Sequence, residues 1–308
     1  GSTIHNWDML ERGYTMHHAI SQDKQGNILA TVSKTSAKIA NGKDVRINDF
    51  IIMMDPEKGE ILQEWDLVHM LDSARYGMTD YDLTSDPFAQ SASNWAHNNG
   101  IVEWGDDYLA TARYQGIFKF NKAGGIEWII SPHGYWRDKY LKLLLNPLHA
   151  DGTPITDPEV IAGTKNCDDF EWPWGCHTAV PLPNGHILYF NNGYGRNFKL
   201  DFTDRKNIYT CGIEYEVDEV NRTVRQVWQY GKERGAAYFT PARSGVQYLE
   251  QTGNRLICPG MSNVLSNGNR GARVTEVDPE TQDVVFELEL EDAIYQRVYR
   301  MSLYPENQ

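Results

Sequence analysis

The chain repeats one short pattern in which a histidine is followed by a strand, a tight turn and an apolar strand. The copies span residues 18–29, 97–109 and 177–188, and they begin with His18, His97 and His177. Each turn is built on Gly, Asn or Asp, which is typical of a β-hairpin. Because repeated units of this kind stack around a common axis, equivalent positions meet in space. The pattern therefore predicts a repetitive β architecture with three histidines near its axis.

A second kind of hairpin alternates with the first. Its copies span 49–66, 116–130, 213–230 and 274–290, and a further hairpin of the first kind, without the histidine, spans 246–258. One hairpin of each kind makes a four-stranded sheet, so the sequence contains four blade-like units. Strands in regular succession with little helical periodicity favour a β-propeller over a β-sandwich. We expect an all-β chain whose residues 1–308 form one propeller domain.

Two long insertions interrupt the strands at 72–94 and 135–175, and both are rich in aromatic residues, Pro and Gly. Loops of this length in a compact domain are usually functional. A short helix is predicted within 137–145. The segment 296–304 resembles a closing strand whose partners would precede residue 1, so we expect the chain to lack an N-terminal portion.

Composition narrows the possible partners. The chain of 308 residues is 41% hydrophobic and 12% aromatic, which suffices for a packed core. No apolar run reaches membrane-spanning length, so no membrane partner is expected. The formal net charge of −13 argues against binding to nucleic acid, which requires clustered Lys and Arg.

The chain contains four cysteines, at positions 167, 176, 211 and 258. Cys167 and Cys176 flank an aromatic loop and would close a small disulfide ring in an oxidising compartment. Two free thiols are the equally weighted alternative. Because no Cys-x-x-Cys pair is present, a zinc ribbon is not expected.

Three histidines at equivalent repeat positions favour a shared site over three separate structural roles. Neutral imidazole is a nucleophile, and burial or a nearby positive charge keeps histidine neutral near pH 7. Arg113 lies on the strand after the His97 turn, and its guanidinium suits a bidentate grip on a sulfate-like group. The residues therefore indicate transfer of a sulfuryl or phosphoryl group, with a second residue protonating the leaving oxygen.

Further candidates are weaker. His17 and His18 should point to opposite faces of a strand, and the spacing to the turn favours His18 as the axial residue. Asn99 and Arg196 are candidate substrate contacts, and Trp174 is a candidate pocket wall, although capping, surface and packing roles are the alternatives. The other histidines show no repeat register and are expected to be structural or on the surface: His5, His69, His133, His149 and His186.

Several ordered segments carry a family resemblance. They are 94–99 (NWAHNN), Arg113, 176–179 (CHTA), 191–196 (NNGYGR) and 230–235 (YGKERG). Together they resemble the bacterial aryl-sulfate sulfotransferases, and the resemblance extends over essentially the whole chain. It corresponds to the C-terminal part of that family, whose members have a secretion signal, an N-terminal β-sandwich and a six-bladed propeller. From the sequence we expect this chain to lack the signal, the sandwich and the early blades of the propeller.

The resemblance implies a specific chemistry. These enzymes are periplasmic, need no metal or other cofactor, and do not use 3′-phosphoadenosine-5′-phosphosulfate. They move a sulfuryl group from a phenolic sulfate donor to a phenol acceptor by a ping-pong route through a sulfohistidine. On this chain the nucleophile would be His177, with His97 and His18 assisting and Arg113 holding the sulfuryl oxygens.

The chain departs from the family at two points. The residue before the nucleophile is commonly Gln and is Cys176 here, and the family's disulfide is placed differently in this loop.

Two other functions compete with sulfuryl transfer: a metalloenzyme with axial histidine ligands, and a propeller that only binds a protein or glycan. A homodimer and the identity of the natural phenols are left open.

Overall fold

The computed structural model describes residues 2–41, 44–75, 95–199, 203–262 and 265–292. Most of the insertion at 72–94, including Asn94, and the strand predicted at 296–304 lie outside these residues.

The described residues form four β-sheets, which confirms the prediction of an all-β propeller of four blade-like units. The first sheet contains β1 (Tyr14–Gln22), β2 (Ile28–Asn41), β3 (Asp44–Met54) and β4 (Ile61–Asp66), in that order. The second contains β5 (Asn98–Trp104), β6 (Asp107–Ala112), β7 (Gly116–Phe120) and β8 (Ile126–Ile130). Neighbouring strands within both sheets are antiparallel.

The third and fourth sheets repeat this meander. The third contains β10 (Ala179–Pro181), β11 (Ile187–Asn191), β12 (Cys211–Asp218) and β13 (Thr223–Tyr230), with β9 (Asn146–Leu148) added at its edge. The fourth contains β14 (Ser244–Tyr248), β15 (Arg255–Pro259), β16 (Gly271–Val277) and β17 (Val284–Glu291). Short helical turns lie between sheets, at α1 (Leu67–Met70), Lys232–Arg234 and α4 (Gly235–Tyr238). Two more, the 3₁₀ turns Arg196–Phe198 and Arg205–Asn207, lie in the loop between β11 and β12 of the third sheet.

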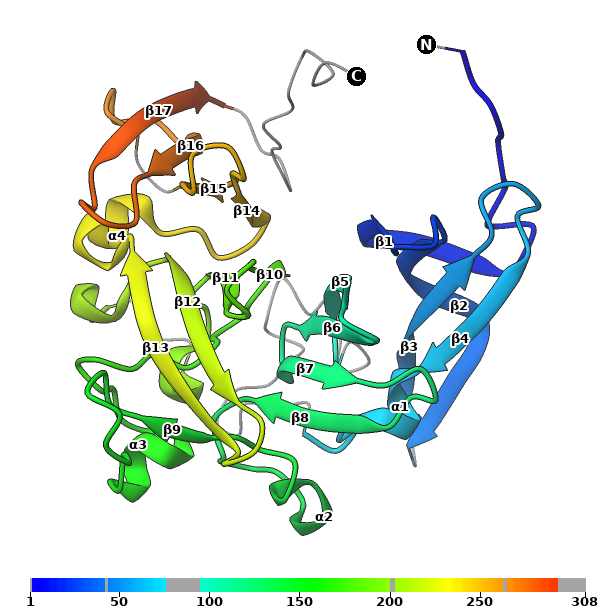
Figure 1. Ribbon diagram of the computed structural model, residues 1–308, viewed down its shortest axis with the longest axis horizontal. Helices are drawn as coiled ribbons and strands as arrows, with labels where there is room; N and C mark the ends of the chain where they lie inside the picture. Colours follow the sequence, from blue (N-terminus) through cyan, green and yellow to red (C-terminus); the bar gives the residue numbers. More distant parts are fainter. Residues whose placement is uncertain (1, 42–43, 76–94, 200–202, 263–264, 293–308) are drawn as a thin grey trace.

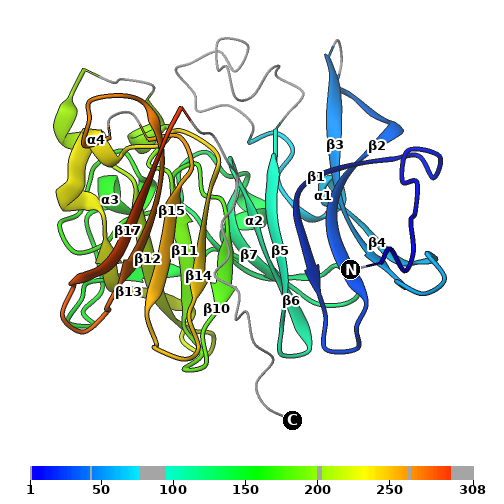
Figure 2. The ribbon, with the colours of Figure 1, turned by 90° about the horizontal axis from the view of Figure 1, so that it is seen from above.

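The sheets follow one another around an arc, and each presents its first strand to the inside (Figures 1 and 2). Strand β1 packs against β5, β5 against β10, and β10 and β11 against β14. The three repeated histidines lie on or directly before β1, β5 and β10. The repeat therefore places them on the inner side of three successive sheets.

Glycines form the tight turns of the first hairpin in each repeat. Gly26 and Gly185 have φ values of 89° and 85°, in the left-handed region that glycine adopts without steric cost. In the first turn Asp23 also accepts hydrogen bonds from the backbone N–H groups of Gln25 and Asn27, at 3.0 and 2.7 Å. The turn residues seen in the sequence thus close the predicted hairpins.

The hydrophobic core lies between neighbouring sheets. One cluster joins the first and second sheets around Trp65, Trp95 and Phe118, and the largest joins the second and third around Trp128 and Tyr215. A third cluster joins the third and fourth sheets. Buried aromatic side chains contribute large contact areas, so this packing fixes how the inner strands face one another.

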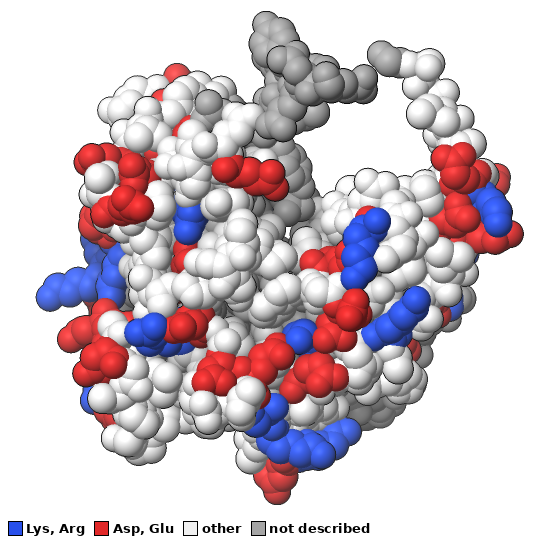
Figure 3. All heavy atoms as spheres, viewed as in Figure 1, with Lys and Arg blue, Asp and Glu red and all other residues white. Residues whose placement is uncertain are grey.

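The insertion at 135–175 is built onto the third sheet. It contains α2 (Asp138–Leu141), which is shorter than the predicted helix, α3 (Pro158–Ala162) and β9. Strand β9 pairs with β13 in parallel, a contact that the sequence pattern did not predict. Of the helices described here, none has the length and apolar character needed to cross a membrane. In Figure 3, Lys and Arg are interspersed with acidic residues and form no continuous basic field on that face.

Candidate active site

The structure brings the three repeated histidines together. The Nε2 atoms of His18 and His97 lie 3.2 Å apart, and the two rings meet edge to face at a centroid distance of 4.7 Å. The ring centroid of His177 lies 6.3 Å from that of His18. Strands from three sheets therefore place three imidazoles around one point.

The backbone at two of these histidines is unusual. His18 and His97 have φ values of 50° and 54°, in the left-handed region that non-glycine residues seldom adopt. Such conformations cost about 1–3 kcal/mol and concentrate at functional sites. Here they coincide with the convergence of the two rings at the inner strands.

The prediction that His17 points away from the axis is wrong. Its Nδ1 lies 3.0 Å from the Nδ1 of His18, and its ring meets that of His18 edge to face. The pairing of β1 with β2 shifts register between Met16 and Ile20, and His18 has its positive φ within this irregularity. The bulge breaks the usual alternation of side chains along a strand, so both neighbours join the cluster.

His177 is held in one tautomer. Its Nδ1 lies 2.6 Å from Oδ1 of Asn192, whose amide nitrogen donates to the Thr240 carbonyl at 2.8 Å and to Ser244 Oγ at 3.0 Å. Because the amide oxygen can only accept, Nδ1 of His177 carries the proton. Nε2 keeps its lone pair and accepts a hydrogen bond from the backbone N–H of Arg243, at 3.2 Å.

The chain around His177 is also fixed by polar contacts. Thr111, on β6, donates its hydroxyl to the carbonyl oxygen of His177. Asn99, on β5, donates its amide to the carbonyl of Cys176 at 2.9 Å. Among the described residues, none hydrogen-bonds to Oδ1 of Asn99, which is buried. Residues of the second sheet thus hold the backbone of Cys176 and His177, which lead into the third sheet.

Arg113 adds a positive charge to the group. It is 2% exposed, and its backbone N–H donates to the carbonyl of His97 at 2.9 Å. Its guanidinium donates to the Pro241 carbonyl at 2.8 Å and lies over the ring of Tyr194, 4.6 Å from the centroid. The carbonyl and the aromatic face together hold the guanidinium in place beside the histidines.

The surroundings keep the histidines neutral. Burial, followed by the charge of Arg113, lowers the pKa of His177 well below its ordinary value. Burial and then the neighbouring His17 and Arg113 charges lower the pKa of His18 to about 3, although part of its side chain faces solvent. The pKa of His97 is lowered well below its usual range, first by burial and then by His18 and Arg113. All three imidazoles are therefore uncharged near pH 7.

A buried carboxyl group stands at the end of the histidine row. Asp49 accepts a hydrogen bond from the backbone N–H of Asn98 at 3.1 Å, and its Oδ1 lies 3.6 Å from Nε2 of His17. Burial raises the pKa of Asp49 to about 7, against the opposing effect of its backbone hydrogen bonds. Asp49, His17, His18 and His97 thus form a row. The two contacts between histidines are within hydrogen-bond distance, and the contact between Asp49 and His17 is longer.

The sequence profile of the arylsulfotransferase (ASST) family matches residues 1–300 of this chain. The chain belongs to the arylsulfotransferase family. It is 29% identical to the arylsulfate sulfotransferase AssT of Escherichia coli O6:H1 (strain CFT073) and 29% identical to AssT of Lelliottia amnigena. Each alignment covers 96% of this chain and 54% of the relative. The chain therefore spans about half the length of these curated arylsulfotransferases.

Solved structures of other proteins resemble the chain only distantly. A putative 6-phosphogluconolactonase from Bacteroides uniformis is 12% identical, with a TM-score of 0.38 over 92% of this chain and 74% of that one. A europium-containing methanol dehydrogenase is 12% identical, with a TM-score of 0.43 over 91% of this chain and 47% of that one. Neither similarity supports a statement about the chemistry of the arylsulfotransferase chain.

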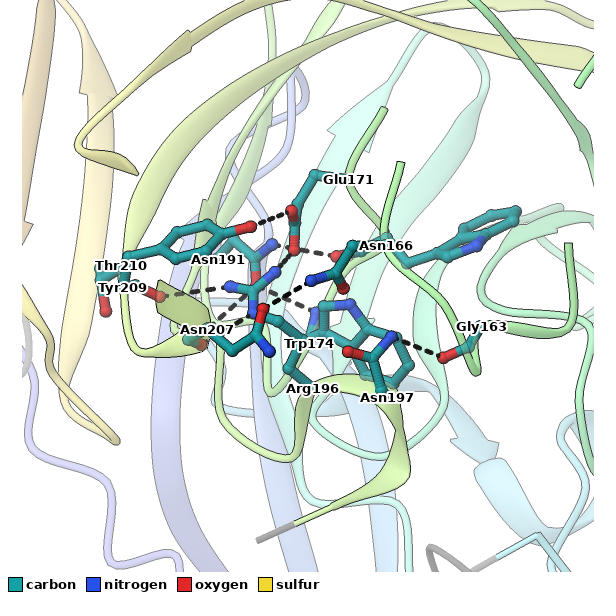
Figure 4. A network of polar contacts seen from close by, with 12 residues as sticks. Gly163, Asn166, Glu171, Trp174, Asn191, Arg196, Asn197, Asn207, Tyr209 and Thr210 are labelled. Atoms are coloured by element: carbon teal, nitrogen blue, oxygen red, sulfur yellow. Dashed lines mark hydrogen bonds and ion pairs between the residues drawn. The ribbon is translucent and has the colours of Figure 1, made fainter. Parts of the chain in front are cut away.

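Arg196 lies apart from the histidines in this chain. It forms a buried ion pair with Glu171, and its guanidinium lies over the ring of Tyr209, 3.8 Å from the centroid (Figure 4). Glu171 in turn accepts a hydrogen bond from the Tyr209 hydroxyl at 2.5 Å. The contacts of Arg196 therefore tie the 135–175 insertion to the loop after β11.

Trp174 also belongs to this region (Figure 4). Its side chain is buried and packs edge to face on Phe198, with ring centroids 5.1 Å apart. Its backbone N–H donates to Asn191 at 3.0 Å. The structure thus places Trp174 in the core, three residues before His177.

The four cysteines are free thiols, so the unpaired alternative for Cys167 and Cys176 is the one observed. Cys176 is fully buried beside the nucleophile segment, and burial raises its pKa to about 12. A thiol of this kind stays protonated at neutral pH and is a weak nucleophile.

Reasoning from sequence missed three contributors to the site. Asn192 lies in a segment whose pattern indicated only a tight turn and a family resemblance. Asp49 lies within the ordinary strand β3, and Arg243 contributes its backbone N–H rather than its side chain. Of the three, only Asn192 could have been found from the repeat. It follows Leu188, the last residue of its repeat copy, by four residues, and Arg113 follows Leu109 of the preceding copy by the same spacing. Equivalent strand ends place both side chains beside the histidines.

Proposed function

We propose that this chain transfers a sulfuryl group from an aryl sulfate ester to a phenol, through a covalent intermediate on His177. One observation carries the proposal. The Nε2 lone pair of a neutral His177 is presented beside the buried charge of Arg113, with two more neutral imidazoles next to it. A neutral nucleophile next to a fixed cation suits attack on an anionic tetrahedral group.

In the first half of the reaction, Nε2 of His177 attacks the sulfur of the donor. The N–S bond forms as the aryl O–S bond breaks, and the electron pair of that bond leaves on the phenolic oxygen. Arg113 stabilises the charge on the sulfuryl oxygens, as preorganised donors do in other group transfers. Nδ1 of His177 keeps its proton, which Asn192 accepts in a hydrogen bond while positive charge develops on the ring.

The departing phenolate needs a proton. A neutral imidazole gives up its only N–H reluctantly, so we assign the source to the row that begins at Asp49, whose raised pKa leaves its carboxyl partly protonated near pH 7. The proton passes along His17, His18 and His97, each of which gives one proton as it gains another. These histidines return to the neutral state, and Asp49 becomes a carboxylate.

In the second half, an acceptor phenol replaces the first product. Its proton returns along the same row to Asp49, its oxygen attacks sulfur, and the N–S bond breaks to restore neutral His177. The buried Oδ1 of Asn99 is suited to accept the phenol hydroxyl before this step. The aryl sulfate donor and the phenol acceptor are the only substrates of this cycle, so it needs no 3′-phosphoadenosine-5′-phosphosulfate.

The family membership supports the substrate class, because the curated relatives are named arylsulfate sulfotransferases. We extend to this chain the two expectations that follow from the resemblance: a periplasmic location, and small phenolic donors and acceptors as its partners.

Metal catalysis at the axis has less support. Among the described residues, three potential ligand atoms lie within 4.8 Å of one another only in the group His149, Cys167 and Asp169. The axial histidines do not form such a group, and Nδ1 of His177 already faces Asn192. A binding-only role gives no chemical use to the row formed by Asp49, His17, His18 and His97.

Turnover of p-nitrophenyl sulfate with phenol as acceptor tests the proposal. We expect His177→Ala to reduce kcat at least 10³-fold, because the nucleophile is lost. His186→Ala is the matched control, since His186 pairs with Glu214 at 2.6 Å on the surface side of the same hairpin. Equal turnover by His177→Ala and the control would overturn the proposal.

A further inference from the structure

A second cluster of reactive side chains lies in the 135–175 insertion, outside the candidate active site. Nδ1 of His149 lies 2.9 Å from Oδ1 of Asp169, and Sγ of Cys167 lies 3.1 Å from the same oxygen. The three potential ligand atoms all lie within 4.8 Å of one another. The proposed transfer reaction uses none of these residues.

The spacing of these atoms is close to that of a zinc site. With Zn–S near 2.3 Å and Zn–N or Zn–O near 2.0–2.1 Å, two ligands of a tetrahedral site lie about 3.4–3.6 Å apart. Oδ1 of Asp169 lies 2.9 and 3.1 Å from the other two atoms, which is within about 0.6 Å of these ideal separations. One thiolate, one imidazole and one carboxylate suit Zn²⁺, whereas Ca²⁺ and Mg²⁺ prefer oxygen alone.

Part of the cluster is already fixed by the backbone. The N–H of Ala150 donates to Oδ2 of Asp169 at 2.9 Å, which leaves Oδ1 facing His149 and Cys167. The N–H of His149 donates to the Thr153 carbonyl at 2.8 Å and holds the turn that carries it. The side chains of His149 and Asp169 are 39% and 37% exposed, so an ion has access from solvent and a fourth position for water.

The local charges permit a cation. The Cys167 thiol donates a hydrogen bond to Asp169. Ion binding would release the thiol proton, so that the thiolate and the carboxylate both become ligands. Asp151 lies near enough to influence His149 and Asp169 electrostatically and adds negative charge. Lys165, whose charge interacts with Cys167, is paired with Asp157 at 2.7 Å.

We propose that His149, Cys167 and Asp169 bind one zinc ion, with water completing the coordination. The ion would join the turn at 149–153 to the segment at 167–169. That segment runs directly into Phe170, Trp172 and Trp174 of the largest core cluster, and then to His177. The site is therefore structural, and it fastens the insertion that leads to the nucleophile.

Cobalt is the probe, because Co²⁺ bound to a thiolate gains a charge-transfer absorption that Zn²⁺ then displaces. Metal-free, reduced wild-type protein should bind one equivalent of Co²⁺ with this band. Cys167→Ser should lose the band, and His149→Gln should weaken binding at least 10-fold. His186→Gln, a change at a carboxylate-paired histidine without a thiol neighbour, should bind as the wild type does.

Thermal unfolding gives a second readout. Zn²⁺ should raise Tm in the wild type and in His186→Gln, but not in Cys167→Ser, because an ion that binds only the folded chain stabilises it. Two results would overturn the proposal: folded wild-type protein without the thiolate band, or a band that persists in Cys167→Ser and so arises from another cysteine. Neither result bears on sulfuryl transfer, which the turnover assay of His177→Ala tests separately.

Discussion

At the scale of single residues, the contacts of His177 determine which ring nitrogen can react. Asn192 holds the proton on Nδ1, and two further hydrogen bonds fix the amide itself. In hydrolases that use a histidine base, a wrong tautomer costs about 10⁴ in kcat although the geometry is intact. Asn192 is therefore a positioning residue whose effect should be visible in the pH dependence of the reaction.

We predict that Asn192→Asp shifts the pH–kcat profile of p-nitrophenyl sulfate turnover to higher pH. A carboxylate next to Nδ1 favours the imidazolium, so the pKa of His177 rises and neutral nucleophile forms only at higher pH. Asn192→Ala should instead lower kcat by about 10²-fold, without that shift. Ser244→Ala is the control, because Ser244 bonds to the Asn192 amide at 3.0 Å. An unshifted profile for Asn192→Asp would contradict the assigned role.

His17 should make the folded chain sensitive to acid. Burial lowers its pKa from 6.5 to about 4, so below pH 6.5 the unfolded chain binds a proton that the folded chain does not. Stability is therefore complete above pH 6.5 and falls as the pH drops toward 4. Asp49, whose pKa is raised to about 7, acts in the opposite direction, because its contribution is lost as the pH rises through 7.

We predict that His17→Gln loses less stability than the wild type between pH 7 and pH 4.5. The difference should be about 2 kcal/mol, since one pKa unit corresponds to about 1.4 kcal/mol. Urea unfolding at the two pH values measures it. Identical losses in the two proteins would show that His17 is not held neutral by the fold.

At the scale of strands, the same contact between a threonine hydroxyl and a histidine carbonyl occurs twice in the repeat. Thr31 on β2 and Thr111 on β6 both end a Leu-Ala-Thr sequence. Each donates its hydroxyl to a histidine carbonyl, that of His17 within the first sheet and that of His177 across to the third. A repeated side chain thus holds the backbone of two histidines near the axis.

Thr111→Val should test the contact between the second and third sheets. Valine keeps the shape of the side chain but leaves the buried carbonyl of His177 without this donor, which costs about 1–3 kcal/mol. Thr111→Ser keeps the hydroxyl and loses only a methyl group. We expect Thr111→Val to unfold at lower urea concentration than Thr111→Ser and to have the lower kcat. A Val variant at least as stable as the Ser variant would contradict this.

The strand pattern in the sequence was sufficient to predict the four sheets and the meeting of His18, His97 and His177, because repeat position is a local property. It was insufficient wherever a tertiary contact determines how a side chain is oriented or which residue it pairs with. The bulge that turns His17 inward depends on pairing with β2. Glu171, which pairs with Arg196, lies in an insertion without a repeat register, and β9 pairs with a strand far along the chain.

At the scale of the whole molecule, all four sheets supply the site. His18 comes from the first, His97 and Arg113 from the second, and His177 from the third, while Arg243 directly precedes β14 of the fourth. The chemistry therefore depends on how the sheets pack around the arc rather than on any one hairpin. This chain covers about half of its curated relatives, so its activity must be measured on the chain itself.

The most direct measurement is the intact mass of the protein after brief mixing with p-nitrophenyl sulfate at neutral pH, without an acceptor. Wild type, His177→Ala and His186→Ala are compared, with peptide mapping of any adduct. We predict a mass increase of one SO₃ unit on wild type and His186→Ala, located on His177, with release of p-nitrophenol. Release of p-nitrophenol without an adduct, or an adduct that persists in His177→Ala, would contradict covalent transfer through His177.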